Sequence, residues 1–417
     1  MERIQNRADS CFSAADILLP TKEDLQRWAV IACDQFTSQP EYWRKVEEIT
    51  DDIRSSYHLI LPESELKHDC RERVETIHRT MRRYLAERVF TEYPDCFIYT
   101  ERVLSTGFIR RGLIGKVDLE QYDYTDGAAL KVRATERTVE ERIPPRMKIR
   151  EGAPLELPHI LLLCNDASHQ LIEPFSAMKN ELPNLYDFDL MMSGGRISGW
   201  LISGEIKDDL EKRLLAYEKN ESEVSTQSLP VYAVGDGNHS LATAKACYEE
   251  MKRNSPETDY SSHPARYVLC ELNNIYDPNL TLEPIHRIVK NCDTQALINS
   301  LKSEFHAPDG TEIPWVSAGR KGTVTISGNN GMLPLASLQM FLDEWLQFHE
   351  GELDYIHGTT ALKELENTPD CIGFQLPPID KKELFHEISA NGVLPRKTFS
   401  MGEAEDKRYY LEARKII

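Results

Sequence analysis

The chain has 417 residues, of which 41% are hydrophobic and 28% charged, and its formal net charge is −19 at pH 7. This length exceeds the size at which one hydrophobic core stops growing, so we expect two or three structural lobes. The negative charge repels polyanions, which argues against nucleic acid as a partner, and no apolar run approaches the roughly 20 residues that cross a bilayer.

The N-terminus lacks the apolar core of a signal peptide, and the nine cysteines are scattered and never form a C-x-x-C pair. We therefore expect a cytoplasmic protein with reduced thiols that acts on small molecules and has no membrane partner. The oligomeric state stays open, with a homodimer as one option.

The predicted elements mix strands and helices along the whole chain. Apolar and turn residues predict strands at 17–20, 96–100, 106–114, 131–134, 159–164, 227–234 and 266–272. Helical spacing is found at 41–46, 64–86 and 242–253. The mixture predicts an α/β (α+β) fold, with an N-terminal lobe at 1–130, a central lobe at 131–290 and a C-terminal lobe at 291–417.

Two stretches between these elements have distinctive composition. The span 135–158 is dense in charge and proline, and we expect an ordered loop or a helix start over a cleft. The pair Gly194 and Gly195 indicates the turn of a hairpin.

The segment 231–242, VYAVGDGNHSLA, combines a strand, a tight loop and a helix start. The first amides of a helix must find partners outside it, and the helix N-terminus carries partial positive charge, so such a turn suits a phosphate oxygen. Glycines at 235 and 237 leave room for a ligand close to the backbone. Gly237 is therefore a candidate phosphate-binding residue.

Asp236 and His239 add titratable groups to this loop. A carboxylate beside a phosphate is repulsive unless a divalent cation lies between them, which favours a Mg²⁺-assisted phosphoryl site with Asp236 as a metal ligand. The structural alternative is that Asp236 or Ser240 caps the helix and His239 is an ordinary packed or surface histidine.

Other polar groups could complete a binding site, because arginine forks bind phosphate or carboxylate in a bidentate manner. The candidates are Glu136, Arg137, Thr138, Arg146, His286, Arg287 and Lys397. For Glu136, Arg137, Thr138 and Arg146 the alternative is a solvated charge run. Asp34 closes a predicted strand and offers a carboxylate as general base, with capping of a turn or helix as its alternative.

The sequence contains no Walker P-loop, G-x-G-x-x-G, H-E-x-x-H or G-x-S-x-G motif. It does resemble the bacterial and archaeal family called domain of unknown function 1015. The matching stretches are 28–43 (WAVIACDQFTSQPEYW), 134–150 (ATERTVEERIPPRMKIR), 185–195 (LYDFDLMMSGG), 234–245 (VGDGNHSLATAK), 283–287 (EPIHR) and 394–402 (LPRKTFSMG).

A more distant similarity bears on chemistry. The loop at 236–239 resembles the D-G-H-H-R loop of ParB/sulfiredoxin-like proteins, which include kinases that phosphorylate free serine. This resemblance implies a ParB/sulfiredoxin-like core with a large insertion and an additional C-terminal lobe. It also implies that Asp236 handles metal and phosphate, that Asn238, His239 and Ser240 hold the phosphates, and that Asp34 is the base for the serine hydroxyl. Asn238 stands where that loop has its first histidine, and Ser240 where it has arginine.

The sequence therefore predicts a phosphotransferase that acts on a small hydroxylated metabolite, free L-serine above all. The donor would be ATP, ADP or pyrophosphate, with Mg²⁺ as cofactor, and Asp34, Asp236 and His239 would be catalytic. Two alternatives stay open: a non-catalytic nucleotide-binding regulator and a metal-dependent hydrolase.

Overall fold

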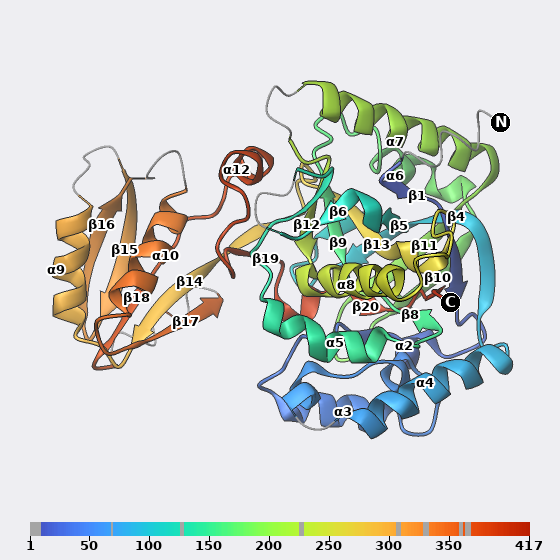
Figure 1. Ribbon diagram of the computed structural model, residues 1–417, viewed down its shortest axis with the longest axis horizontal. Coiled ribbons are helices and arrows are strands. Elements are labelled where there is room, and N and C mark those ends of the chain that lie inside the picture. The colour runs from blue at the N-terminus through green and yellow to red at the C-terminus, as the bar shows by residue number, and fades with distance from the viewer. Residues whose placement is uncertain are drawn as a thin grey trace. The chain divides into compact units, whose positions relative to one another are not determined.

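The computed structural model describes residues 10–67, 70–125, 129–224, 229–305, 310–327, 333–357, 362 and 368–417 (Figure 1). The chain divides into two compact units. The first combines Met1–Leu280 with Glu403–Ile417, and the second is Thr281–Gly402.

A mixed sheet forms the centre of the first unit. Within the described residues it has 11 strands, in the order β10-β11-β4-β5-β13-β9-β12-β7-β6, with β1 paired to β5 and β2 to β4. The strands are β1 (Phe12–Ser13), β2 (Ala15–Leu19), β4 (Thr91–Val103), β5 (Ile109–Asp118), β6 (Tyr122–Asp123), β7 (Val132–Ala134), β9 (Leu161–Cys164), β10 (Asn184–Asp189), β11 (Arg196–Ile202), β12 (Tyr232–Asp236) and β13 (Tyr267–Asn274).

Helices cover both faces of this sheet, as Figure 1 shows with α3 and α4 below it and α7 above it. The helices of the first unit are α2 (Leu25–Trp28), α3 (Pro40–Thr50), α4 (Arg71–Ala86), α5 (Ile143–Arg150), α6 (Pro174–Met178), α7 (Gly204–Val224) and α8 (Asn238–Asn254).

Alternation along the strands explains the two hydrophobic cores. Successive side chains of a strand point to opposite faces of a sheet. In β4, Cys96 and Ile98 pack into the core that contains the apolar residues of α3 and α4. Phe97 and Tyr99 pack into the other core, with residues of α7 and α8. The first unit is thus a sheet between two helical layers, and α8 belongs to the layer of α7.

The C-terminal segment after residue 402 returns to the first unit and pairs with its N-terminal half. Strand β20 (Tyr409–Tyr410) is antiparallel to β3 (Val30–Ile31), and β21 (Arg414–Lys415) is antiparallel to β8 (Leu155–Glu156). These short pairings are supported by charged side chains that lie in the protein interior.

Arg408 is the centre of the largest of these buried groups. Its guanidinium lies 2.8 Å from the carboxylate of Glu271 in β13 and also contacts Glu412. Arg414 makes a similar pair with Glu156, at 2.7 Å. All five side chains are at most 6% exposed, so water screens their attraction very little.

The second unit has its own six-stranded sheet within the described residues, in the order β16-β15-β18-β14-β17 with β19 paired to β14. Its strands are β14 (Leu282–Lys290), β15 (Thr311–Ser317), β16 (Arg320–Ile326), β17 (Glu352–His357), β18 (Cys371–Phe374) and β19 (Phe399–Met401). Its helices include α9 (Thr294–Glu304), α10 (Pro334–Trp345) and α12 (Leu384–Asn391).

The structure confirms the mixed α/β class that the sequence predicted. The apolar run at 159–164 contains the buried strand β9, and Gly194 and Gly195 lie in the hairpin connection between β10 and β11, directly after its turn at Met192 and Ser193. The predicted helix at 64–86 begins only at Arg71, after a short 3-10 turn, and the predicted helix at 242–253 begins earlier, at Asn238. The first two residues of the strand predicted at 227–234 lie outside the described residues, because the structure does not describe 225–228.

The three predicted lobes differ from the two units that the structure defines. A boundary at residue 130 falls inside the large sheet, because β4 and β5 pair with β11 and β13 from the predicted central lobe. The C-terminal segment Glu403–Ile417 leaves the predicted C-terminal lobe and joins the first unit. Long-range strand pairing thus overrides boundaries drawn from local composition.

Two expectations from composition can be compared with the structure. Among the residues that the structure describes, no helix has the length and apolar character that spanning a membrane requires. All nine cysteines lie in the described residues, and each has a free thiol, in agreement with the expectation of reduced cysteines.

We predict that Arg408→Met destabilises the protein by about 3–5 kcal/mol, because it leaves Glu271 and Glu412 buried without their main counter-charge. Urea unfolding of the full chain measures this loss. The control is Arg44→Met, which removes an exposed helical pair with Glu41 and is expected to cost at most about 1 kcal/mol. Equal effects of the two variants would contradict the structural importance of the buried group.

Candidate functional site

The turn between β12 and α8 has a backbone geometry that only glycine adopts easily. Gly237 has φ +78°, in the left-handed region, and a Cβ placed on it would lie 3.1 Å from both Cα and Cγ1 of Ile160. Asp236 is the last residue of β12, and Asn238 is the first of α8. The glycine therefore lets the chain reverse tightly, so that the first amides of α8 lie directly beside the carboxylate of Asp236.

Asp236 forms an ion pair with a lysine that is distant in sequence. Its Oδ2 lies 2.9 Å from Nζ of Lys407, and its Oδ1 accepts a hydrogen bond of 2.9 Å from the backbone N–H of Gly237. Burial raises the pKa of Asp236. Lys407, His159 and the Gly237 N–H together lower it by more than burial raises it, so the net shift is downward. The carboxylate is thus ionised at neutral pH, and a cation faces it.

The segment after β7 is bound to the same turn. The backbone N–H of Thr135 donates to Oδ1 of Asn238 at 3.3 Å, and the amide of Asn238 donates to Oγ1 of Thr135 at 3.4 Å. Farther along, the N–H of Val139 donates to Nε2 of His239 at 3.2 Å. Since Nε2 of His239 is an acceptor, the proton of the neutral ring lies on Nδ1. The structure therefore brings the 135–139 segment and the loop at 236–240 together.

The predicted binding residues of that segment lie beside the loop. Arg137 is exposed and Glu136 is partly exposed. Oγ1 of Thr138 is buried and is one of the side-chain oxygens for which the described residues offer no hydrogen-bond partner. A buried hydroxyl without a partner loses the hydrogen bonds that it makes in water, so an additional group at this position would be stabilising.

A chain of hydrogen bonds leads from the loop to the N-terminal part of the protein. Oγ of Ser240 lies 3.1 Å from Nε2 of His159, and Nδ1 of His159 lies 2.7 Å from the hydroxyl of Tyr410. That hydroxyl donates to Sγ of Cys33 at 3.1 Å and accepts from the N–H of Cys33 at 3.2 Å. The start of α8, the entrance to β9, β20 and the end of β3 thus meet at one place.

Asp34, the predicted base, follows Cys33 directly and is partly buried. Its Oδ1 accepts a hydrogen bond of 3.0 Å from the side chain of Gln35, and its charge helps to raise the pKa of Tyr410, mainly raised by burial. His159 contacts Tyr410 and, through Nε2, Oγ of Ser240, so it connects the segment of Asp34 to the turn that follows Asp236.

Arg146 lies in α5 and forms an ion pair with Glu63. Burial lowers the pKa of Arg146, and the negative charge of Asp34 opposes that effect, so the guanidinium is close to this carboxylate. The structure therefore brings Arg146 and Asp34 together, two residues that the sequence analysis had selected separately.

The remaining candidates, His286, Arg287 and Lys397, belong to the second unit. Arg287 is completely buried there, and its guanidinium donates to the side chain of Gln339 and to the backbone carbonyls of Ile285, Arg396 and Lys397. Nδ1 of His286 accepts from the N–H of Leu376, and the Lys397 side chain is exposed. Within that unit, Arg287 ties β14 to the segment before β19.

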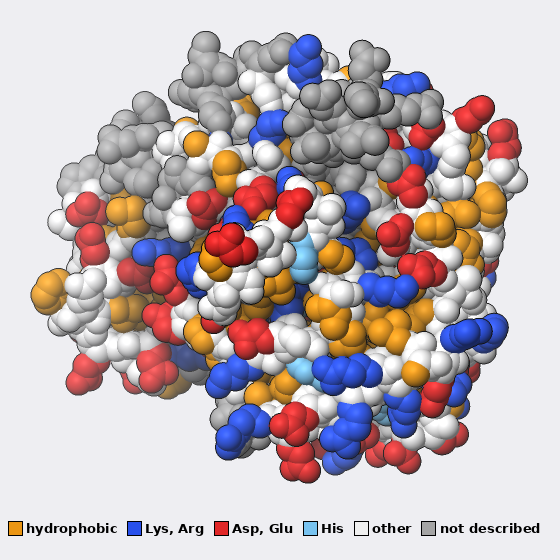
Figure 2. Space-filling model, turned by 45° about the vertical axis from the view of Figure 1, so that its right-hand side comes forward, with side chains coloured by type: hydrophobic (Ala, Val, Ile, Leu, Met, Phe, Trp, Pro, Cys, Tyr) orange, Lys and Arg blue, Asp and Glu red, His pale blue; other side chains and the backbone are white. Residues whose placement is uncertain are grey.

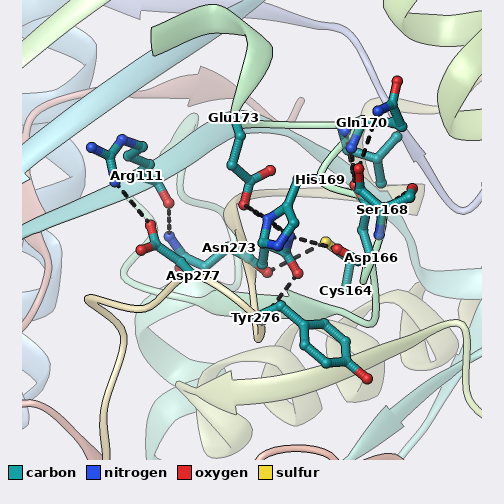
Figure 3. Close-up of polar contacts among 12 residues, drawn as sticks. Arg111, Cys164, Asp166, Ser168, His169, Gln170, Glu173, Asn273, Tyr276 and Asp277 are labelled. Carbon is teal, nitrogen blue, oxygen red and sulfur yellow. Dashed lines mark hydrogen bonds and ion pairs between the residues drawn. The ribbon is translucent and has the colours of Figure 1, made fainter.

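A second polar group lies at the opposite end of β9 and β13 (Figure 3). The carboxylate of Asp166 accepts hydrogen bonds from backbone N–H groups of the following turn. The amide of Asn274 donates to the carbonyl of Asp166 and to Oε1 of Glu173, both at 2.8 Å, and Nδ1 of His169 lies 3.0 Å from the same carboxylate oxygen. These contacts fasten the loop after β9 to the end of β13.

Surface charge is uneven despite the negative total. Figure 2 shows Lys and Arg side chains, in blue, gathered over the lower part of the face in view, among fewer acidic ones. Helices α4 and α5, in the lower part of Figure 1, carry several basic residues: Arg71, Arg73, Arg79, Arg82, Arg83, Arg146, Lys148 and Arg150. The net charge of −19 therefore leaves room for a small anionic ligand.

Sequence reasoning missed three residues of this site: His159, Lys407 and Tyr410. His159 stands directly before an apolar run that was analysed only as a strand. Lys407 and Tyr410 lie in the last eleven residues, which had shown no motif. The one available signal was the matching of the family across nearly the whole chain, which includes the C-terminal part.

The fold and the site together define a mixed α/β protein in which ionised and hydroxyl side chains converge on a glycine-containing strand–turn–helix. The chain belongs to the family described as protein of unknown function (DUF1015), whose model matches residues 14–415. A search of curated proteins found no match.

Several solved structures are weakly similar. A free serine kinase in complex with AMP is 13% identical, with a TM-score of 0.37, over 72% of this chain and 91% of that chain. A conserved hypothetical protein from Pyrococcus furiosus is 13% identical, with a TM-score of 0.36, over 70% and 92%. SbnI from Staphylococcus aureus, truncated at its C-terminus, is 10% identical, with a TM-score of 0.36, over 69% and 82%.

We predict that Gly237→Ala destabilises the protein more than Gly152→Ala. Both glycines have similar positive φ values, +78° and +73°, so both variants carry a backbone cost of about 1–2 kcal/mol. Only at Gly237 does the new methyl group meet backbone, at Cα of Ile160. Urea unfolding of both variants gives the loss of unfolding free energy for each, and the difference between the two losses measures the cost of the contact with Ile160. Equal losses would mean that Ile160 does not constrain the turn.

Proposed function

We propose that this protein is a phosphotransferase, which moves a phosphoryl group from ATP, ADP or pyrophosphate to the hydroxyl of a small metabolite, with free L-serine as the acceptor. The observation that carries the proposal is the pair of Asp236 and Lys407 beside the first amides of α8. A lysine ammonium and a helix N-terminus both bind phosphate oxygens. A carboxylate in the same place would bind the magnesium ion of a magnesium–phosphate complex.

The residues present fit Mg²⁺ only together with a phosphate ligand. The Asp236 carboxylate is ionised, and each of its oxygens accepts one hydrogen bond or ion pair while retaining a second lone pair. Within the described residues no group of three or more His, Cys, Asp or Glu side chains could hold a metal. Magnesium commonly takes one or two carboxylates plus substrate phosphates, which is the set that Asp236 and a donor would provide. When bound, it would neutralise charge on the transferred group.

Other residues of the turn would hold the donor. Gly237 allows close approach of phosphate to the backbone, and Asn238 and Ser240 carry polar side chains that are partly exposed. His239 is fixed by the N–H of Val139, so its ring is oriented before any ligand binds. The buried Oγ1 of Thr138 would gain a partner from a ligand at this position.

Asp34 is proposed as the base that accepts the proton of the acceptor hydroxyl. It lies beside Arg146, whose guanidinium would bind the carboxylate of an amino acid or a donor phosphate. The resemblance of the loop to that of free-serine kinases is the reason for choosing serine as acceptor. His286, Arg287 and Lys397 are left out of the proposed site, because Arg287 already donates to four groups of its own unit.

Phosphorus NMR tests this function directly. The full chain is incubated with Mg²⁺, with ATP, ADP or pyrophosphate, and with L-serine. Phosphoserine is the expected product. Free phosphate that forms equally without serine would instead indicate a metal-dependent hydrolase. Tight donor binding with no turnover, measured by calorimetry on the same samples, would indicate a non-catalytic regulator.

We expect Asp236→Asn to lower the transfer rate at least about 100-fold, because an amide neither attracts a magnesium–phosphate complex nor pairs with Lys407. The matched control is Asp209→Asn, an exposed carboxylate that pairs with Arg213 on the surface of α7 and is expected to leave the rate unchanged. A wild-type rate in the Asp236 variant would remove this turn from the mechanism.

Magnesium binding is expected to depend on the donor. With one carboxylate available, Mg²⁺ alone should show no saturable binding by calorimetry at millimolar concentrations, whereas Mg²⁺ and donor should strengthen each other's binding about tenfold or more. This mutual strengthening of Mg²⁺ and donor binding should be smaller in Asp236→Asn. Tight binding of Mg²⁺ without donor would contradict the proposed arrangement.

A further inference from the structure

Three side chains beside the proposed donor site, Ser240, His159 and Tyr410, form a continuous chain of polar contacts. Ser240 Oγ lies 3.1 Å from Nε2 of His159, and Nδ1 of the same ring lies 2.7 Å from the Tyr410 hydroxyl. Ser240 is partly exposed, whereas His159 is 7% and Tyr410 2% exposed. Enzymes activate a serine nucleophile by a similar arrangement. It consists of an accessible hydroxyl, a buried imidazole in contact with it, and a third group that orients the imidazole.

The hydrogen bonds around Tyr410 accommodate a His159 ring that carries its proton on Nδ1. The Tyr410 hydroxyl donates to Sγ of Cys33, and its oxygen accepts from the N–H of Cys33. With the hydroxyl hydrogen directed at Sγ, Nδ1–H of His159 is the donor in the 2.7 Å contact. Nε2 then has its lone pair directed at Ser240.

The buried environment keeps this assignment in place. Burial raises the pKa of Tyr410 well above its usual value, so the hydroxyl stays protonated. Burial also raises the pKa of Cys33 to about 12, so the thiol is uncharged and no thiolate competes with Ser240 as nucleophile. Tyr410 is therefore a positioning residue that holds His159 in the tautomer that can accept a proton.

We propose that Ser240 is a covalent phosphoryl acceptor, with His159 as its general base, so that transfer proceeds through a phosphoseryl enzyme. This inference rests on the proposed function, because it needs a phosphoryl donor at the same turn. Ser240 lies in the first turn of α8, four residues after Asp236, whose carboxylate pairs with Lys407 and where the donor would bind.

The two steps balance. In the first, a bond forms between Ser240 Oγ and the terminal phosphorus of ATP, the bond from that phosphorus to the bridging oxygen breaks, ADP leaves, and the serine proton moves to Nε2 of His159. In the second, the acceptor hydroxyl attacks the phosphorus and loses its proton, in the proposed site to Asp34, while Ser240 Oγ leaves and recovers its proton from His159. With pyrophosphate, phosphate leaves in place of ADP.

An exchange experiment without acceptor is specific for such an intermediate. The full chain is incubated with Mg²⁺, unlabelled ATP and radiolabelled ADP, and label is expected to appear in ATP. In parallel, γ-labelled ATP should transfer up to one phosphate per chain to the protein, in a form stable to acid and released by alkali, and mass spectrometry should place it on Ser240. An acid-labile, hydroxylamine-sensitive phosphate would be an acyl phosphate on a carboxylate and would overturn the proposal.

Variants separate the roles. Ser240→Ala should abolish both labelling and exchange, and His159→Gln should slow labelling roughly 100-fold without moving its position. Tyr410→Phe should slow labelling less and shift the pH at which labelling reaches half its maximum, since the tautomer is no longer fixed. Ser255→Ala, at the exposed C-terminal end of the same helix, is the control and should behave as wild type.

The outcomes distinguish this inference from the function on which it rests. If phosphoserine metabolite forms but the protein is never labelled and no exchange occurs, then transfer is direct and only the covalent step fails. If neither product, label nor exchange is found with ATP, ADP or pyrophosphate as donor, then both fail together. Ser240→Ala with unchanged exchange would also overturn the covalent step, and its melting temperature and donor binding verify that it is folded.

Discussion

The buried pairing of Arg408 with Glu271 and Glu412 is the interaction on which the site depends. Desolvating three charges is unfavourable, and their mutual attraction compensates only in close, hydrogen-bonded geometry, which the 2.8 Å contact with Glu271 provides. Glu271 lies in β13, at the centre of the large sheet. The pairing therefore holds the C-terminal segment at one fixed place, and an alternative path for this segment would leave the charges unpaired.

That constraint positions both ends of the proposed site. Lys407 directly precedes Arg408, and its ammonium reaches Asp236. Tyr410 follows two residues later, in the strand that pairs with β3, and it contacts both His159 and Cys33. Since Asp34 comes next after Cys33, one short segment of chain sets the surroundings of the carboxylates of Asp34 and Asp236.

The return of the segment also affects how the site forms. Residues 281–402 fold as a separate unit between β13 and the C-terminal segment, so closing this loop brings the two ends together. Loop closure becomes only slowly more unfavourable with length, so an inserted unit of this size is tolerated if the contacts at the closure are strong. Arg408, Arg414 and their buried partners supply such contacts.

Much of the local structure could be predicted from the sequence, because local patterns carried it. The apolar run at 159–164 contains a buried strand, since every side chain in β9 is covered, and the expected hairpin joins β10 to β11, although its turn lies at Met192 and Ser193, just before the two glycines. The loop at 236–240 and the segment at 135–139 were selected for their chemistry, and the structure joins them by hydrogen bonds. Their catalytic and binding roles stay predictions.

Other features could not be predicted, because they depend on pairing between distant segments. Nothing local distinguishes Lys407 or Tyr410 from other residues of a mixed tail, and His159 lies at the edge of a pattern that indicates only a strand. The start of α4 was misplaced because helical spacing continues through 63–67, where the chain forms a tighter turn. The predicted lobe boundaries differ from the two units for the same reason that Lys407 was missed, because the order of strands in the sheet does not follow their order in the chain.

The two carboxylates and the serine have separable tasks in this arrangement. Asp236 is held ionised by Lys407 and so suits a bound cation rather than proton transfer. Asp34 follows Cys33, which contacts Tyr410, and its charge acts on Arg146, the group that would bind the carboxylate of an acceptor amino acid. Ser240 contacts His159, which in turn contacts Tyr410, so the proposed nucleophile and its base connect the turn of Asp236 to the segment of Asp34. The proposed stepwise transfer would use this series of contacts, because it supplies both a nucleophile and a base for its proton.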